Sequence, residues 1–382
     1  MNHSSRKLLL RDGTVVLPNR TIERGTILIE GEYISSIGEG RIADAETIDL
    51  GGMTVLSGFI DVHIHGAVGV DVMDATADGL RSVSGYLASQ GVTSWLPTFV
   101  PASDENYASA VAAIAQAMNG SGARILGVHY EGPFVNAMQC GALHKEYFKT
   151  YSGADDLAFL VTPENAVRMI TLAPEISGGV ELVRELKARG WVISIGHTRA
   201  DLRILDEACD AGARHMTHFM NAMPSLHHRA PGPVAWGLSR EDVTFDMIAD
   251  GIHLDPFMLS LLVKIKGVHG ITLISDAIAA AGKGDGDYQI WGETITVKNG
   301  RTANASGSIA GSVISMLDAV RFMHSLGVSY VDLAQMASSN PARLLGVDDE
   351  CGSIEVGKRA DLVALDQNGN VGLTLIGGRP VS

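Results

Sequence analysis

The sequence contains few cysteines and no long apolar run. Its three cysteines, Cys140, Cys209 and Cys351, are far apart among 382 residues and form no CxxC or paired framework. Secreted proteins that depend on disulfides carry paired cysteines, so this pattern predicts reduced thiols and a cytoplasmic protein. The apolar run Leu8–Leu10 is too short for a signal peptide. No run approaches the ~20 apolar residues of a membrane helix.

Basic residues are also scarce. Lys and Arg number 29 against 43 Asp and Glu, which gives a net charge of −14. An acidic surface repels nucleic acid and anionic lipid, so neither is expected as a partner. A phosphorylated small molecule is still compatible, because one local arginine outweighs distant charges that are screened over about 10 Å.

Aromatic residues make up only 5% of the chain, whereas 46% of residues are hydrophobic and 44 are glycine. This balance is typical of a packed aliphatic α/β protein with many tight loops. The chain is longer than a single core usually grows, so we expect one large domain and one smaller domain.

Both ends of the chain are rich in short β-type runs, separated by turn residues such as Asp12-Gly13 and Gly357-Lys358. The runs are Lys7–Leu10, Thr14–Leu17, Thr26–Glu30, Tyr33–Gly38, Gly352–Val356, Asp361–Asp366 and Val371–Ile376. Neither end has enough apolar residues to fold alone. We therefore predict that residues 1–56 and 345–382 form one small β domain beside a central domain, residues 57–344.

In the central part, short apolar runs alternate with segments of helical period. The runs are Gly58–His65, Thr93–Thr98, Ile125–Glu131, Met169–Ala173, Val192–His197, His215–His218, Phe245–Asp250 and Ile271–Asp276. The expected helices include Asp78–Gln90, Asp104–Met118, Gly179–Arg189 and Ala200–Ala211, and Gly91, Gly190 and Gly212 follow three of them as C-caps. Eight such units predict an α/β fold, the (β/α)8 or TIM barrel.

Many of the expected strands end in a side chain that can bind metal or carry protons. These residues are His65, Glu131, His197, His218, Asp250 and Asp276. All strands of a barrel point their carboxyl ends at one mouth, where active sites lie, so we expect these residues to converge there.

The types of these residues suggest metal-assisted hydrolysis. His63 and His65 are two apart on a strand and face the same side, so they could share a cation, although ordinary histidines are the commoner outcome for a bare HxH pair. Glu131, His197 and His218 form a Glu/His/His set that suits Zn²⁺ or another divalent ion with one open position. Asp276 could take a proton from water and return it to an amine, or it could be a ligand or a helix N-cap.

Three further polar residues are expected on loops at the same mouth. Arg229 follows the His218 strand in a Pro- and Gly-containing loop and could fork onto a phosphate, although a solvated arginine is the commoner case. Asn221 and His253 could hydrogen-bond a substrate or cap helices.

Taken in order, the motifs resemble those of the N-acetylglucosamine-6-phosphate deacetylase family within the amidohydrolase superfamily, over nearly the whole chain. They are Gly58–Gly66, His129–Phe134, Gly196–Thr198, Thr217–Met223, His227–Arg229, Ala249–His253 and Ile274–Asp276. The resemblance implies a TIM barrel with a small β-sandwich built from both termini. It also implies that Glu131, His197 and His218 bind the principal metal, and that His63 and His65 can hold a second ion.

The same resemblance implies roles for the remaining site residues. Asp276 would be the general base and then the acid. The sugar phosphate would contact Asn221, Ala222, Arg229, His253 and the backbone of Ile309, Ala310 and Gly311. The arginine would reach the phosphate of a neighbouring subunit, which implies a homodimer. Family members usually carry His or Gln after the Gly141-Ala142 pair; here Leu143 follows and His144 comes one place later.

The expected reaction is metal-dependent hydrolysis of the acetamide of N-acetylglucosamine 6-phosphate, with Zn²⁺ as the first choice of metal, Fe²⁺ or Mn²⁺ as alternatives, and one or two ions per subunit. Rival interpretations are the galacto epimer or a formyl derivative as substrate, another amidohydrolase, or a non-catalytic homologue. Many cyclic amidases bridge two metals with a carbamylated lysine, and the matching strand here ends in Glu131. The full ligand set argues against a non-catalytic homologue.

Overall fold

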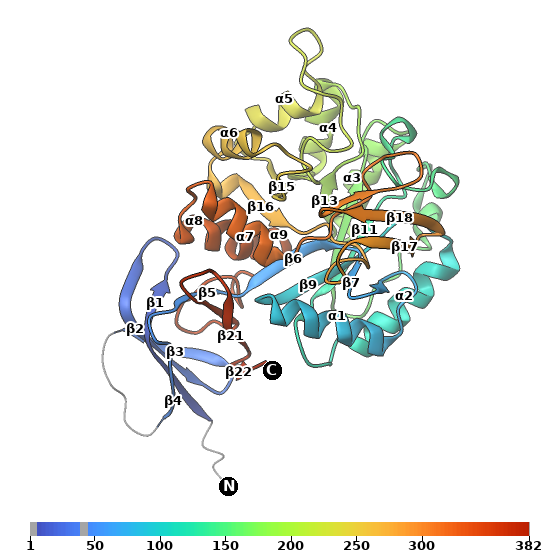
Figure 1. The fold of residues 1–382 in the computed structure, drawn as a ribbon. Coiled ribbons are helices and arrows are strands. Elements are labelled where there is room, and N and C mark those ends of the chain that lie inside the picture. The colour runs from blue at the N-terminus through green and yellow to red at the C-terminus, as the bar shows by residue number, and fades with distance from the viewer. Residues whose placement is uncertain (1–5, 39–44, 382) are drawn as a thin grey trace.

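Eight parallel strands form the centre of the molecule in the computed structural model, which describes residues 6–38 and 45–381 (Figure 1). The strands are β6 (Phe59–Ile64), β9 (Val92–Phe99), β11 (Gly127–Glu131), β12 (Val167–Leu172), β13 (Val192–Ile195), β14 (His215–Met216), β15 (Thr244–Ile248) and β16 (Ile271–Ile274). They pair in this order from β6 to β16. The Asp276 amide donates to the His63 carbonyl at 2.9 Å and brings the last strand back to the first. The predicted barrel is confirmed.

Burial explains why these runs become strands. All residues of β6, β9, β11 and β16 are buried, as expected of parallel strands covered on both faces. The strands end sooner than predicted, however. His197, His218 and Asp276 each lie two residues beyond their strand, and their φ values of 47°, 29° and 50° break the extended backbone.

Helices cover the outside of the barrel. They are α1 (Ala77–Ser89), α2 (Asp104–Ala117), α3 (Gly179–Ala188), α4 (Leu202–Ala211), α5 (Gly232–Ser239), α6 (Pro256–Lys266), α7 (Met316–Ser325), α8 (Tyr330–Ala334) and α9 (Asn340–Leu345). The side chains of Thr76, Ser103 and Asp201 cap the amino ends of α1, α2 and α4. The four predicted helices agree within two residues, and their following glycines have positive φ as expected.

The two ends of the chain share one sheet, as predicted. It contains β1 (Lys7–Val16), β2 (Thr21–Glu30), β3 (Tyr33–Gly38), β4 (Glu46–Asp49), β5 (Thr54–Ser57), β20 (Leu362–Leu365), β21 (Val371–Ile376) and β22 (Arg379–Pro380). A separate apolar cluster that includes Leu10, Ile27 and Leu375 lies beneath it. Residues 1–5, 39–44 and 382, which the predicted domain limits include, lie outside the described residues, and the limits themselves stay a prediction.

Two details of this domain differ from the prediction. The expected turn at Asp12-Gly13 is wrong, because β1 runs through it with a register shift against β2. The expected strand Gly352–Val356 is also wrong: the segment is irregular, and its Ile354 packs into the apolar cluster without pairing.

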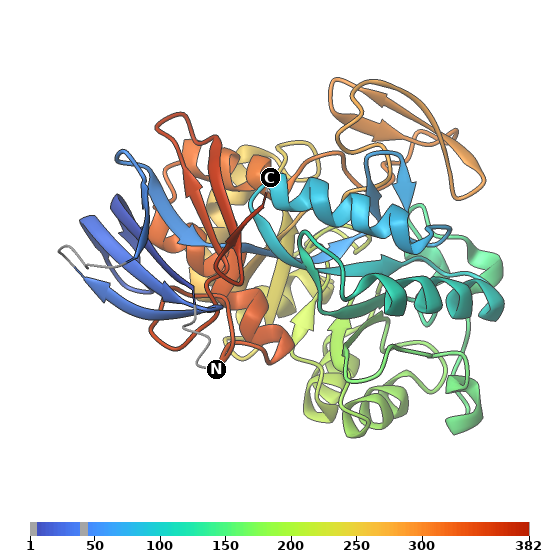
Figure 2. The ribbon, with the colours of Figure 1, turned by 90° about the horizontal axis from the view of Figure 1, so that it is seen from below.

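A three-stranded antiparallel sheet follows β16 and has no counterpart in the sequence prediction. It consists of β17 (Gly286–Ile290), β18 (Glu293–Lys298) and β19 (Arg301–Ala303). Figure 2 shows this sheet projecting from the barrel, on the side away from the terminal domain. Two short pieces complete the list, the β7–β8 hairpin (Gly66–Ala67 and Val70–Asp71) and β10 (Arg124–Ile125). None of the described helices has the length and apolar character needed to cross a membrane.

Candidate active site

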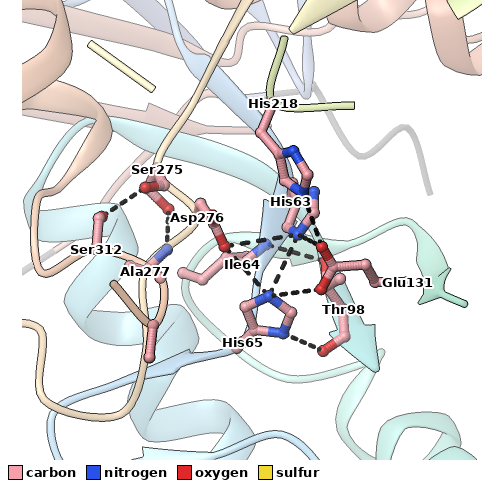
Figure 3. Close-up of polar contacts among 12 residues, drawn as sticks. His63, Ile64, His65, Thr98, Glu131, His218, Ser275, Asp276, Ala277 and Ser312 are labelled. Atoms are coloured by element: carbon pink, nitrogen blue, oxygen red, sulfur yellow. Dashed lines mark hydrogen bonds and ion pairs between the residues drawn. The ribbon is translucent and has the colours of Figure 1, made fainter. Parts of the chain in front are cut away.

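Two groups of metal-competent side chains meet at the carboxyl ends of the strands. Within each group the ligand atoms lie within 4.8 Å of one another, and all six residues are buried. The groups are Glu131, His197 and His218, and His63, His65 and Asp276. Figure 3 shows Asp276 and Glu131 approaching the His63–His65 pair from opposite sides.

Glu131 connects the two groups. Its Oε1 lies 2.9 Å from Nε2 of both His197 and His218. The same oxygen lies 3.6 Å from His63 Nε2, and Oε2 lies 3.4 Å from His65 Nε2. On the other side, Asp276 Oδ1 lies 3.2 Å from His65 Nε2.

The spacing of the imidazoles fits a divalent metal. Nε2 of His197 and His218 are 3.1 Å apart, and Nε2 of His63 and His65 are 3.2 Å apart. Two nitrogens bound at about 2.0–2.1 Å to one tetrahedral ion lie about 3.3 Å apart. Imidazole and carboxylate donors suit Zn²⁺ and other borderline ions. The residues present therefore fit the metal that the sequence implies.

Backbone carbonyls orient two of these rings. His65 Nδ1 is 3.0 Å from the Thr98 carbonyl, and His197 Nδ1 is 2.7 Å from the Gln139 carbonyl. A ring that donates from Nδ1 keeps the Nε2 lone pair free for a metal. Thr98 and Gln139 carried no signal in the sequence, because their side chains do not make these contacts.

Electrostatics favour positive charge between the carboxylates. Burial alone would raise the pKa of Glu131, but His63, His197 and His218 hold it well below its usual range. Burial alone would lower the pKa of His65, but hydrogen bonds to Asp276 and Glu131 raise it to about 10. Without the neighbouring histidines, burying the negative charges of Glu131 and Asp276 would cost free energy.

The backbone fixes Asp276. Its carbonyl accepts from Ser312 N at 2.7 Å, and Ser275 Oγ donates to Asp61 Oδ2 at 2.5 Å. Gly311 passes so close that an added Cβ would lie 2.8 Å from the Asp276 carbonyl oxygen. This contact, together with a φ of 56°, explains the glycine at position 311.

The site opens into a cavity of about 330 Å³ that most of the sequence-predicted residues line. These are His65, Glu131, His197, His218, Asp276, Ala142, Asn221, Ala222, His253, Ile309 and Gly311. His253 is held by Asp250, whose Oδ2 lies 2.6 Å from its Nδ1. His63 and Ala310 are fully buried and do not line the cavity.

Two predicted residues lie elsewhere. His144 is not among the lining residues, where Leu143 is found; its Nδ1 is 3.1 Å from Glu146 Oε1 and its Nε2 is 3.9 Å from Glu293 Oε1. Arg229 is exposed on a loop held by a bridge between His227 and Ala230. Within this single chain it does not line the cavity.

Trp291 is a lining residue that the sequence analysis missed. It occupies the turn between β17 and β18 with a φ of 53°, and its ring meets His65 edge-on with centroids 5.3 Å apart. The signal was present: a Trp291-Gly292 pair between alternating runs is a two-residue hairpin turn. Asp246 was also missed, and it accepts a hydrogen bond from the His218 amide.

Known proteins resemble this chain over nearly its whole length. A model described as the amidohydrolase family matches residues 54–381. The N-acetylglucosamine-6-phosphate deacetylase of Bacillus subtilis is 37% identical over 97% of this chain and 96% of its own length. The N-acetylgalactosamine-6-phosphate deacetylase of Escherichia coli O157:H7 is 39% identical over 85% and 86%. The structure of a mutant N-acetyl-D-glucosamine-6-phosphate deacetylase from Mycobacterium smegmatis, in complex with N-acetyl-D-glucosamine-6-phosphate, matches with a TM-score of 0.90 and 31% identity over 99% of both chains.

Proposed function

Because this chain belongs to the N-acetylglucosamine-6-phosphate deacetylase family of amidohydrolases, we propose that it hydrolyses the acetamide of N-acetylglucosamine 6-phosphate to glucosamine 6-phosphate and acetate. One observation carries the proposal within the structure. The carboxylate of Asp276 lines the same cavity as Glu131, His197 and His218, so a proton carrier and a metal donor set face one small space.

Glu131, His197 and His218 would hold the principal metal, and His63 and His65 would hold a second ion with Glu131 between them. When bound, a divalent ion supplies Lewis acidity, which lowers the pKa of water and polarises an amide carbonyl. The donor set favours Zn²⁺, with Fe²⁺ or Mn²⁺ as alternatives.

Asp276 is the proton carrier in this proposal. Burial would raise its pKa, but His63 and His65 lower it, so the carboxylate is ionised and ready to accept a proton from the attacking water. It then gives that proton to the departing amine, which leaves as glucosamine 6-phosphate. One residue can serve both steps because the oxygen of the attacking water and the nitrogen of the departing amine both bond to the acyl carbon.

The rest of the cavity would position the sugar phosphate. His253, Asn221 and the backbone at Ala222, Ile309 and Gly311 would hold the hydroxyls and the phosphate, and Ala142 would lie against the acyl end. His144 would reach the substrate only by leaving Glu146. Fixing the sugar in this way lowers the entropic part of the barrier.

The proposal extends to a homodimer in the cytoplasm. Arg229 would reach the phosphate bound by a second copy, which is supported by its exposure outside its own cavity and by the exposed Leu226 and Phe257, at 54% and 71%. The cytoplasmic location is supported by three free cysteines. The galacto epimer is kept as an alternative substrate, because the E. coli relative named for it is 39% identical.

Acetate release by the metal-loaded protein tests the proposal. N-acetylglucosamine 6-phosphate, its galacto epimer and unphosphorylated N-acetylglucosamine are compared at equal concentrations. We expect strong preference for the gluco 6-phosphate. Preference for the epimer would establish the alternative, and no release from either phosphate would overturn the assignment of this substrate class.

A further inference from the structure

A second cavity lies at the opposite end of the barrel from the active site. Residues at the amino ends of four consecutive strands line it, Val192 of β13, His215 of β14, Thr244 of β15 and Thr272 of β16. Its volume is about 240 Å³. A water molecule takes up about 30 Å³ of liquid, so the space holds a phosphate group with several waters or a small organic part.

Basic side chains dominate this second cavity. Lys187, Arg214, Arg343 and His269 line it, against Asp242 as the one carboxylate in the lining. Such a cluster of basic groups is unusual in a chain of net charge −14. Charges that line one cavity are only partly screened from one another, so their positive potentials add there.

The single carboxylate is already neutralised from outside the cavity. Arg240 donates to Asp242 with Nε at 2.8 Å and Nη2 at 2.9 Å, whereas Arg214 Nε is 3.9 Å away. Arg240 itself does not line the space. Among the described residues, Lys187 and Arg343 therefore have no carboxylate partner, whereas Arg214 lies within ion-pair distance of Asp242 and donates to the Ala213 carbonyl at 3.1 Å.

Several of the lining groups are free to bind. Among the described residues, the Lys187 ammonium and the His269 ring have no hydrogen-bond or ion-pair partner, and Arg343 contacts only Asn340 Oδ1 at 3.3 Å. Thr272 is 1% exposed and lines the cavity, yet its hydroxyl has no hydrogen-bond partner in the described part of the chain. These groups can therefore donate hydrogen bonds to an anion that enters the cavity.

We propose that this second cavity binds a phosphate group, either as the inorganic ion or on a small phosphorylated molecule. Arginine forks fit phosphate oxygens, lysine contributes a compact charge, and the Thr272 hydroxyl supplies a neutral donor. The site is independent of the proposed active site, since the two cavities share no lining residue.

Chemical labelling of lysine at this site tests the proposal. The metal-loaded protein is acetylated briefly with an N-hydroxysuccinimide ester, and the modified peptides are quantified with and without inorganic phosphate, at ionic strength matched with chloride. We expect phosphate to slow labelling of Lys187 at least 3-fold. The exposed Lys264, which lies outside the cavity, is the internal control.

Two variants and a second ligand complete the test. Arg343→Gln should abolish protection of Lys187, whereas Arg379→Gln, with the same loss of charge at the exposed β22, should retain it. Glucose 6-phosphate protecting at lower concentration than the inorganic ion would identify a phosphorylated molecule, and the reverse would identify the free ion. Equal slowing of Lys187 and Lys264, or no protection by either ligand, would overturn the proposal.

Discussion

Asp276 owes its position to its backbone. Its amide donates to the His63 carbonyl at 2.9 Å, which returns β16 to β6, and its carbonyl accepts from the Ser312 amide at 2.7 Å. The side chain is therefore free to carry protons without also holding the fold. A neutral amide of the same shape should leave the backbone contacts in place.

We accordingly expect Asp276→Asn to retain the fold and metal content but to lose about 10³-fold in kcat, the usual range for loss of a positioned general base. Steady-state acetate release, metal analysis and thermal melting measure the three properties. Asp74→Asn, at an exposed position, is the matched control and should remain fully active. A kcat within tenfold of the unmodified protein would remove Asp276 from the proton-carrying role.

At the scale of elements, the loop after β15 and the β17–β18 hairpin shape the cavity from different sides. The loop fixes His253 through Asp250, which also accepts from the amides of Ile252 and His253 at 2.8 Å. The hairpin carries Trp291 to His65. Neither element belongs to the barrel itself, so each can be altered with little damage to the core.

The Asp250 contact should give a pH-dependent contribution to stability. Burial alone would raise its pKa, but the His253 side chain and the two amides lower it. A carboxyl whose pKa is lower in the folded than in the unfolded state stabilises the fold at pH values above its unfolded pKa. This stabilisation is lost as the pH falls through the folded pKa. Asp250→Asn should therefore unfold more easily by about 1.5–3 kcal/mol at pH 7, in the range for hydrogen bonds to charged groups.

Urea denaturation of metal-free protein at pH 7 and pH 4 measures this effect. The gap between the two proteins should begin to narrow at the lower pH, because the carboxyl of the unfolded chain, with an ordinary pKa of about 3.9, starts to protonate there while the folded carboxylate stays ionised. A gap that is constant with pH would mean that Asp250 contributes through packing alone.

The hairpin should influence the choice of acyl group. Trp291 forms a wall of the cavity beside His65, so Trp291→Ala should enlarge the space next to the metal donors. We expect the ratio of kcat/KM for N-propanoyl over N-acetyl substrate to rise about tenfold, which equals about 1.4 kcal/mol. Trp291→Phe is the conservative control. An unchanged ratio in the alanine variant would place the acyl group elsewhere in the cavity.

The elements also show what the sequence could reveal. Helical periodicity and glycine caps located α1 to α4 within two residues, because both signals are local. His197, His218 and Asp276 have positive φ values, so their strands end before they reach these residues. An apolar run in the sequence gives no indication of a positive φ. The β17–β19 sheet carried a signal, since Ile295 and Val297 of β18 are buried and alternate with exposed residues. Its strands are short and half of their residues are exposed, however, so no apolar run marked them.

At the scale of the whole molecule, the site joins distant parts of one barrel. The six metal-competent residues come from β6, β11 and the loops after β6, β13, β14 and β16, so they span 213 positions of the chain between His63 and Asp276. Convergence of these residues followed from one rule, that parallel strands end at a common mouth. The positions of His144 and Arg229 did not follow from it, because both residues lie on loops outside the barrel strands.

Such a site should couple metal to stability. An ion held by residues from several strands binds the folded state alone, and it also compensates the buried charge of Glu131 and Asp276. At a free metal concentration 1,000-fold above Kd, the stabilisation is about 4 kcal/mol. Chelation should therefore lower the melting temperature by several degrees, and returning Zn²⁺ should restore it.

Glu131→Gln provides the control for this measurement. It keeps the size of the side chain but removes the charge that faces His63, His197 and His218, so its melting temperature should respond only weakly to Zn²⁺. If the unmodified protein melts at the same temperature with and without metal, Glu131 and the four histidines proposed as ligands do not hold an ion that stabilises the fold. If the melting temperature of the variant responds to Zn²⁺ as strongly as that of the unmodified protein, the metal binds elsewhere. The proposed role of Glu131 as a ligand shared by the two groups would then be wrong.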